Sequence, residues 1–261
     1  MALTRRIHPT RFGQAHVRSQ DGGGRPLVLL HPSPRSGDMW EPLQARLTRP
    51  TIAPDRLGYG YSDAPPWALS LEQYARSTID ALDAAGVAAP FDVLGVGVGS
   101  LEAIELAQQL DGRVRRVAVV GVPLFTPQEQ QRQMEKYSEQ PLRPALEGGH
   151  LIGGWRGCYA YRAPPYDLAT VHRRFLDLAL AANPGAALRA AGGYPIERKL
   201  RSLKQPLIVF APRDEILEQT TRVKPLLKPD GVYVDLPDLG FDPFDLATER
   251  MADLIRQYLG D

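Results

Sequence analysis

Short apolar runs alternate with helical segments along most of this chain, and this alternation restricts its fold more than any other feature. The runs that predict buried strands are 26–31, 51–54, 91–95, 114–122, 207–211 and 232–236. The segments with apolar residues at helical spacing are 69–85, 101–110 and 247–258. Strands that alternate with helices build βαβ units. The sequence therefore predicts an α/β fold in which a mostly parallel, doubly wound sheet lies between helices.

The strand pattern stops between residues 123 and 203. This region holds a Gln- and Glu-rich helical segment, an aromatic and glycine-rich stretch at 153–161 and a helix at 168–182. Insertions into such sheets lie at the carboxyl ends of the strands, where ligands bind. We therefore expect a core made of residues 1–122 and 204–261, with residues 123–203 inserted as a helical cap over a pocket. A disordered linker is the alternative interpretation of this region.

Charge and cysteine content argue against several classes of partner. The 31 Lys and Arg residues balance 30 Asp and Glu residues, so no strong positive field attracts nucleic acid or an anionic membrane. The single cysteine, Cys158, can form neither an intrachain disulfide nor a cysteine-ligated zinc cluster. No apolar stretch approaches the ~18 residues of a membrane span, and the amino terminus lacks the apolar part of a signal peptide. We expect a cytoplasmic protein without metal or cofactor that binds a small organic molecule. Its oligomeric state, a homodimer included, stays open.

Three motifs connect the predicted strands to a known family. The first strand is followed by HPSP at 31–34, the second by DRLGYGYS at 55–62, and a strand–turn–helix junction carries GVGVG at 95–99. With these motifs the chain resembles the α/β-hydrolase superfamily from about residue 25 to its carboxyl terminus. The resemblance implies the α/β-hydrolase fold, and it implies a Ser–His–acid triad at fixed places in the chain.

Two of the three triad positions carry the wrong residue for that chemistry. The nucleophile position of the glycine-rich turn is Gly97, and the position of the histidine is Phe241, whereas Asp214 matches the acid. A serine hydroxyl needs a neighbouring base to become nucleophilic, so the two losses are consistent with each other. Gly97 has no side chain, so an acyl-enzyme cannot form at this position.

The oxyanion hole implied by the resemblance consists of backbone groups and survives these losses. By motif position its donors are the N–H groups of Ser33 and Val98, and the helix that begins at Val98 adds a favourable dipole. Asp214 in an apolar pocket beside Phe241 would have a raised pKa, which suits a general base. The alternative for Asp214 is a salt bridge to an arginine such as Arg213 or Arg35.

Other polar residues have structural and functional interpretations side by side. His31 either braces the oxyanion loop or transfers a proton. Ser100 is expected to bond to backbone rather than act as a nucleophile, and Asp242 to cap the following turn. Among the remaining histidines, we expect His8 and His16 to be solvated. We expect His150 and His172 to have surface or packing roles in the cap.

A pocket under the cap would bind substrate through aromatic side chains and one arginine. Arg35, beside the oxyanion motif, could pair with a ligand carboxylate or phenolate, with a solvated surface position as the alternative. Besides Phe241, the candidate aromatic residues are Trp40, Tyr137, Trp155, Tyr159, Tyr161 and Tyr194. Ordinary core packing explains most of these aromatic residues equally well.

The leading hypothesis is a small-molecule enzyme without a covalent intermediate, which performs lyase, isomerase, cyclase or cofactor-free chemistry. In it, the oxyanion hole stabilises an enolate-like species and Asp214 or His31 moves the proton. A catalytically silent ligand-binding protein is the main alternative. A hydrolase that uses water activated by Asp214 is the third.

Overall fold

A single eight-stranded sheet forms the centre of the molecule. The computed structural model describes residues 3–137, 142–160, 167–240 and 242–260. The strands are β1 (Leu3–Thr10), β2 (Gly13–Gln20), β3 (Leu27–Leu30), β4 (Thr51–Pro54), β5 (Phe91–Val96), β6 (Val114–Val120), β7 (Leu207–Pro212) and β8 (Val232–Leu236). Their order is β1-β2-β4-β3-β5-β6-β7-β8, and every pair from β4 to β8 is parallel. The predicted α/β class and the mostly parallel sheet are confirmed.

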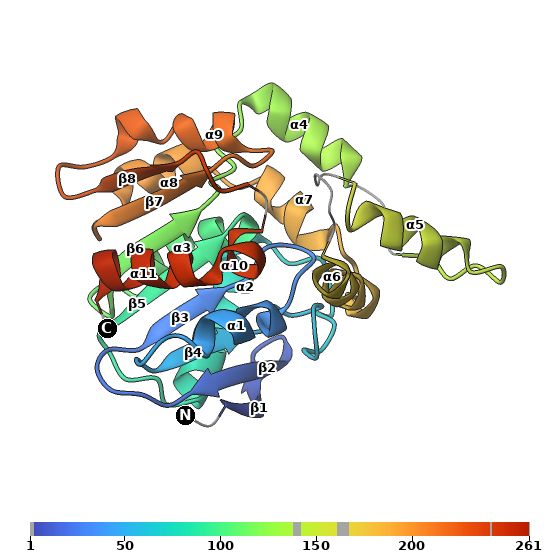
Figure 1. The fold of residues 1–261 in the computed structure, drawn as a ribbon, viewed down its shortest axis with the longest axis horizontal. Helices are drawn as coiled ribbons and strands as arrows, with labels where there is room; N and C mark the ends of the chain where they lie inside the picture. Colours follow the sequence, from blue (N-terminus) through green and yellow to red (C-terminus); the bar gives the residue numbers. More distant parts are fainter. Residues whose placement is uncertain (1–2, 138–141, 161–166, 241, 261) are drawn as a thin grey trace.

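Helices cover both faces of this sheet (Figure 1). They are η1 (Gly37–Trp40), α1 (Glu41–Gln44), α2 (Leu71–Ala84), α3 (Val98–Gln109), α4 (Pro127–Lys136), α5 (Gly149–Gly157), α6 (Leu168–Leu180), α7 (Ala186–Gly192), α8 (Ile196–Ser202), α9 (Leu217–Thr221), η2 (Lys224–Leu226), α10 (Pro243–Leu246) and α11 (Thr248–Leu259). Helices α2 and α3 pack on one face, and α1 packs with α11 on the other. Two apolar cores, one per face, therefore hold the sheet.

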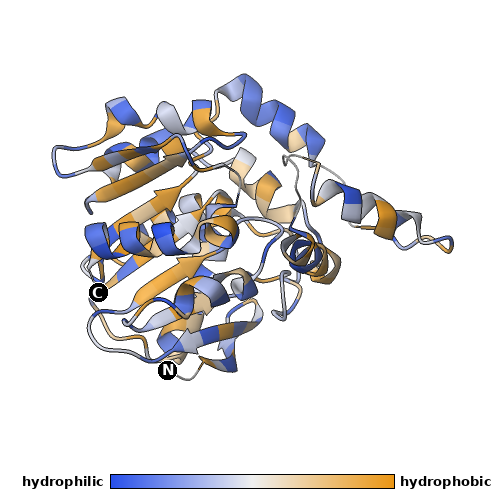
Figure 2. Cartoon of the chain, viewed as in Figure 1, coloured by the Kyte–Doolittle hydropathy of each residue, from blue (hydrophilic) through white to orange (hydrophobic). Residues whose placement is uncertain are grey.

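The local sequence explains why the central elements form where they do. All residues of β3, β4 and β7 are buried, which matches apolar runs covered on both faces, and Figure 2 shows the strands as the apolar centre. Helix α2 begins at a capping box in which the Ser70 and Gln73 side chains bond to each other's backbone N–H. Its Leu71, Tyr74 and Leu82 face the core. Burial of each such side chain stabilises the fold by ~1.5–3 kcal/mol.

The amino-terminal segment is folded into the sheet, in contrast to the expectation for its histidines. Strands β1 and β2 form an antiparallel hairpin, and β2 pairs antiparallel with β4. His16 on β2 is 5% exposed, and its Nδ1 lies 2.8 Å from Asp55 Oδ2. The expectation that His16 is solvated is therefore wrong, because the hairpin brings it against the loop at 55–62.

Helices α4 to α8 lie between β6 and β7, where the strand pattern of the sequence stops. In Figure 1, α4, α5 and α6 lie to one side of the sheet, and α5 extends away from the body. Helix α8 instead packs against α3. The boundaries of the cap at 123 and 203 stay a prediction.

Among the residues described, no helix is both long and apolar enough to cross a bilayer.

Candidate active site

A cavity of about 400 Å³ opens at the carboxyl ends of the parallel strands. Its floor comes from the segments that follow β3, β5, β6 and β7, and α4 and α7 contribute further lining. The polar lining residues are Ser33, Arg35, Gln133, Lys136, Tyr137, Arg174, Asp214, Glu215, Gln219 and Asp242. The glycine turn and Asp214 thus share one cavity, as the motifs predict.

The glycine turn between β5 and α3 has a geometry that explains its outer glycines. A Cβ on Gly95 would lie 2.1 Å from the Gly99 carbonyl oxygen, and a Cβ on Gly99 would lie 2.3 Å from the Leu30 carbonyl oxygen. Both distances are impossible for a side chain. Gly97, with φ 56° and ψ −115°, differs: a Cβ there would meet only Pro32 Cβ, at 3.4 Å. The turn therefore has room for a side chain at the nucleophile position, and the chain places none there.

The two residues predicted to supply the oxyanion hole, Ser33 and Val98, both line the cavity. Across the described residues neither N–H has a protein acceptor. Val98 is the first residue of α3, so its N–H belongs to the donors that a helix leaves unpaired. The Ser33 hydroxyl is already bonded, because it donates to the Pro184 carbonyl at 2.7 Å. This arrangement is compatible with the predicted oxyanion hole, whose role stays a prediction.

Asp214 follows β7 and has one hydrogen bond to its side chain. Its Oδ1 accepts from the Ile216 N–H at 3.0 Å. Within the described parts of the chain, its carboxyl makes no ion pair, so the predicted alternative of a salt bridge to Arg213 or Arg35 is not what the structure has. Burial raises the pKa of Asp214 to about 6, and the nearby Glu215 charge adds to the rise. Asp214 is thus a carboxyl that changes protonation close to neutral pH.

This raised pKa predicts a pH-dependent stability cost. Below the ordinary pKa of 3.8 the carboxyl is protonated in both states, and the cost of burying its charge grows as the pH rises to about 6. We expect Asp214→Asn to unfold at higher urea concentration at pH 8, with a gain of about 1–3 kcal/mol. At pH 4 the variant and the wild type should be nearly equal. A gain of the same size at both values of pH would contradict the assignment.

His31 is a brace rather than a cavity residue. Its ring is 1% exposed, Nδ1 lies 2.9 Å from the Pro32 carbonyl oxygen, and Nε2 accepts from the Arg56 N–H at 2.9 Å. Burial, together with the positive charges of Arg56 and Arg35, holds the pKa of His31 well below its usual range. A neutral imidazole with both nitrogens engaged supports the bracing interpretation over the proton-transfer interpretation.

Arg35 lines the cavity, but its charge is used inside the protein. Its Nε donates to Asp177 Oδ2 and its Nη1 to Asp245 Oδ2, each at 2.7 Å. The side chain is 2% exposed. The solvated surface position is therefore wrong for Arg35. Its Nη2 has no hydrogen-bond partner among the described residues, and pairing with a ligand stays a prediction. It connects the loop after β3 with α6 and with α10 (Figure 1).

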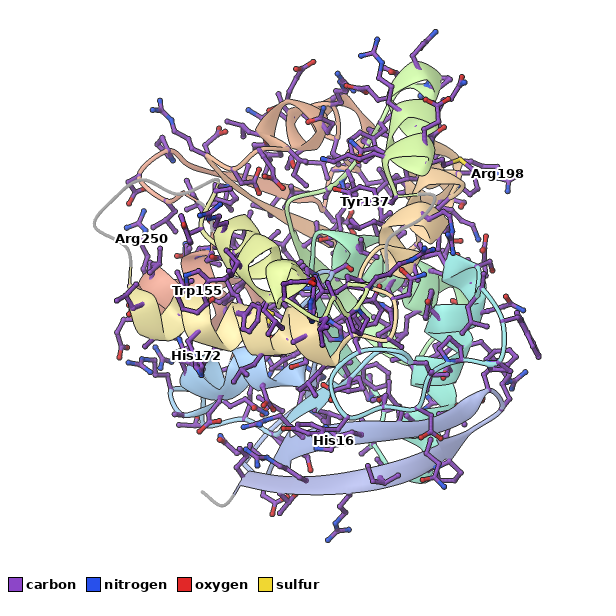
Figure 3. All side chains as sticks on the ribbon, turned by 90° about the vertical axis from the view of Figure 1, so that its right-hand side faces the viewer. His16, Tyr137, Trp155, His172, Arg198 and Arg250 are labelled. Atoms are coloured by element: carbon purple, nitrogen blue, oxygen red, sulfur yellow. The ribbon has the colours of Figure 1, made fainter. Side chains whose placement is uncertain are left out.

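Most of the predicted aromatic residues lie elsewhere. Trp40 is 0% exposed and packs edge-on against Phe244, with ring centroids 4.8 Å apart, so it belongs to the core. Trp155 on α5 packs against Phe175 and His172 of α6 (Figure 3), and neither Trp155 nor Tyr159 lines the cavity.

Tyr137, at the end of α4, is the one of the described aromatic candidates that lines the cavity. Tyr194 is buried and donates to Glu105 Oε2 at 2.7 Å. Phe241 and Tyr161 lie outside the described residues. Sequence reasoning missed the apolar lining residues Met39, Phe125, Leu188 and Phe244. Helical periodicity could have identified Leu188 as a residue on an apolar helix face, but no sequence signal shows which helix lines the cavity.

The remaining polar candidates have structural roles. Ser100 is 0% exposed and its hydroxyl donates to the carbonyls of Gly95 and Val120 at 2.9 and 3.1 Å, which confirms its predicted backbone bonding. Asp242 precedes α10 but makes no side-chain cap; it forms an ion pair with Arg174 instead. The capping prediction for Asp242 is therefore wrong, because its left-handed backbone turns the carboxylate toward α6.

Comparisons with known proteins place these features in a wider context. Residues 25–151 match the family described as alpha/beta hydrolase fold. The chain is 27% identical over 273 residues to the putative hydrolase LipZ of Mycobacterium tuberculosis, across 97% of this chain and 94% of that protein. It is 34% identical over 108 residues to a 2-hydroxymuconate semialdehyde hydrolase of Pseudomonas putida, across 38% of this chain and 37% of the relative.

Solved structures match over almost the whole chain. A hydrolase from Pseudomonas aeruginosa has a TM-score of 0.80 at 17% identity, covering 99% of this chain and 98% of the other. An enol-lactonase from Burkholderia xenovorans has a TM-score of 0.79 at 18% identity, covering 98% of this chain and 100% of the other. These matches extend through the glycine turn, the inserted helices and the segment after β7.

Proposed function

We propose that this chain, which has the α/β-hydrolase fold, belongs to the α/β-hydrolase superfamily and is a small-molecule enzyme that works without a covalent intermediate. Asp214 acts as the general base, and the backbone N–H groups of Ser33 and Val98 stabilise an enolate-like oxygen. The reaction class is lyase, isomerase, cyclase or another cofactor-free conversion that passes through such a species.

The observation that carries this proposal is Asp214 itself. Its carboxyl is partly buried at the wall of the cavity and has no cation to neutralise it among the described residues, and this burial raises its pKa to about 6. As a carboxylate it can take a proton from the carbon next to a substrate carbonyl. The C–H electron pair then forms the C=C bond of the enolate, and the π pair of the carbonyl moves onto its oxygen. Each backbone donor at that oxygen is worth ~2.7–4 kcal/mol in enzymes of known mechanism. Gly97 leaves the space above the turn free for the carbonyl end.

Hydrolysis by water activated at Asp214 is the second candidate. It is favoured by the names of the relatives, which are hydrolases, a lactonase and esterases. Catalytically silent ligand binding is the third, because the lining described here contains no histidine to share the proton transfer.

Deuterium exchange tests the proposal without knowledge of the natural substrate. Phenylacetone in D₂O is incubated with the protein, and loss of its α-protons is followed by ¹H NMR. We expect catalysed exchange whose rate rises through pH about 6 and then levels off, because only the carboxylate form of Asp214 is a base.

Two results would contradict the proposal. An absence of exchange at every pH, with phenylacetone or a cyclic ketone such as 2-tetralone bound, would favour silent binding. Release of p-nitrophenol from p-nitrophenyl acetate without ketone exchange would favour hydrolysis.

A further inference from the structure

Gly121 lies directly beneath the carboxyl group of Asp214. It is the residue after β6, it is buried, and its φ is +66°. A Cβ built on Gly121 would lie 2.9 Å from Asp214 Oδ2 and 3.1 Å from Ile216 Cδ1. The first distance is shorter than any real contact of a Cβ atom, so only glycine lets the carboxyl group occupy this place.

Two hydrogen bonds restrict how the carboxyl group of Asp214 could move away from a Cβ at Gly121. On one side, Asp214 Oδ1 is held by the Ile216 N–H at 3.0 Å. On the other, the Val122 N–H donates to Thr220 Oγ1 at 2.8 Å, which fixes the segment after β6 against α9. A methyl group at Gly121 would therefore push Oδ2 away from the wall and into the cavity.

We propose that Gly121 is a positioning residue for Asp214: the bare Cα surface of Gly121 seats Oδ2 against the cavity wall, while Oδ1 is anchored by Ile216. This inference rests on the proposed function only because it takes Asp214 as the base. The effect of Gly121 on the pKa of Asp214 does not depend on which reaction the protein catalyses.

The experiment compares Gly121→Ala with Gly86→Ala. Gly86 ends α2 with φ +69°, and a Cβ there would meet nothing within 4 Å. Both glycines have a similar positive φ, but only Gly121→Ala has the contact with Asp214. The readout is the pKa of Asp214 from ¹³C NMR of aspartate-labelled protein, with its signal assigned through Asp214→Asn. The exchange rate of phenylacetone is measured alongside.

For Gly121→Ala we expect the pKa of Asp214 to fall by about one unit toward its ordinary value, because the displaced carboxyl is better solvated. Exchange at pH 8 should fall at least ten-fold. Gly86→Ala should keep the wild-type pKa and rate. A wild-type pKa in folded Gly121→Ala would overturn the inference. Absent exchange with a shifted pKa would sink the proposed function and leave the positioning intact.

A second pair of variants covers the case in which Gly121→Ala does not fold. In an Asp214→Ala background the carboxyl is gone, so Gly121→Ala should then fold, with only the 3.1 Å contact to the end of the Ile216 side chain left to relieve. A double variant that still does not fold would overturn the inference, because the glycine would then be required by a contact other than Asp214.

Discussion

Asp214→Asn is expected to slow deuterium exchange of phenylacetone at pH 8 by at least 10²-fold. A positioned general base contributes about 10²–10⁴-fold to a proton transfer, and asparagine cannot accept a proton. The amide still fits the site, since its oxygen can accept from the Ile216 N–H as Asp214 Oδ1 does. The loss should therefore fall on the rate constant of exchange rather than on the Kd of the ketone, and the rise of the rate through pH about 6 should disappear.

Asp230→Asn is the matched control for this experiment. Asp230 is exposed in the turn before β8 and does not line the cavity. Its substitution by Asn therefore removes the same charge from the chain without changing the cavity. We expect its exchange rate to stay within two-fold of wild type. Equal rates for Asp214→Asn and wild type would show that another group moves the proton.

Gly99→Ala is expected to cost more than about 4 kcal/mol in the free energy of unfolding, enough to prevent folding of a protein of ordinary stability. A Cβ at Gly99 would lie 2.3 Å from the Leu30 carbonyl oxygen and 2.8 Å from that of His31. Both obstacles are backbone atoms, so no side-chain rotation can relieve them. β3 would have to separate from α3, which would disturb the strand on which the cavity floor depends.

The comparison variant is Gly97→Ala in the same turn. Its Cβ would meet only Pro32 Cβ at 3.4 Å, and the remaining cost is that of a strained backbone with φ 56° and ψ −115°, about 1–3 kcal/mol. Urea unfolding of the two variants measures the difference. Similar losses for both would mean that the turn tolerates no side chain anywhere, and the argument for an open nucleophile position would then fail.

The sequence could predict the parts of this structure that depend on local patterns. Strands buried on both faces are continuous apolar runs, and α2 and α3 carry regular apolar spacing, so these elements were predictable to within a few residues. The glycine turn at 95–99 was equally predictable, because close contacts with neighbouring backbone atoms require glycine at its two outer positions.

The amino-terminal hairpin was missed because its strands lack that pattern. β1 is an edge strand that carries Arg5 and Arg6 on exposed positions, so its sequence reads as a polar arm. Only its pairing with β2, and the pairing of β2 with β4, make it a strand. His16 becomes buried through the same long-range pairing.

The electrostatics of the cavity could not be predicted, since they depend on partners far apart in the chain. Arg35 could have paired with Asp214, and instead it reaches Asp177 and Asp245, 142 and 210 residues away along the sequence. Within the described residues Asp214 has no ion-pair partner, and burial raises its pKa. The orientation of Trp40 toward Phe244 likewise follows from packing between η1 and α10, which are far apart in the chain.

The guanidinium group of Arg35 has a consequence for exchanging parts between relatives. One of its two carboxylate partners, Asp177, belongs to the inserted helices, and the other, Asp245, belongs to the main body. A chimaera that takes its segment between β6 and β7 from another protein inherits a buried cation with half its counter-charge removed, unless the donor supplies an acidic residue at the same place. Exchange of these helices between proteins is therefore limited by a single arginine side chain.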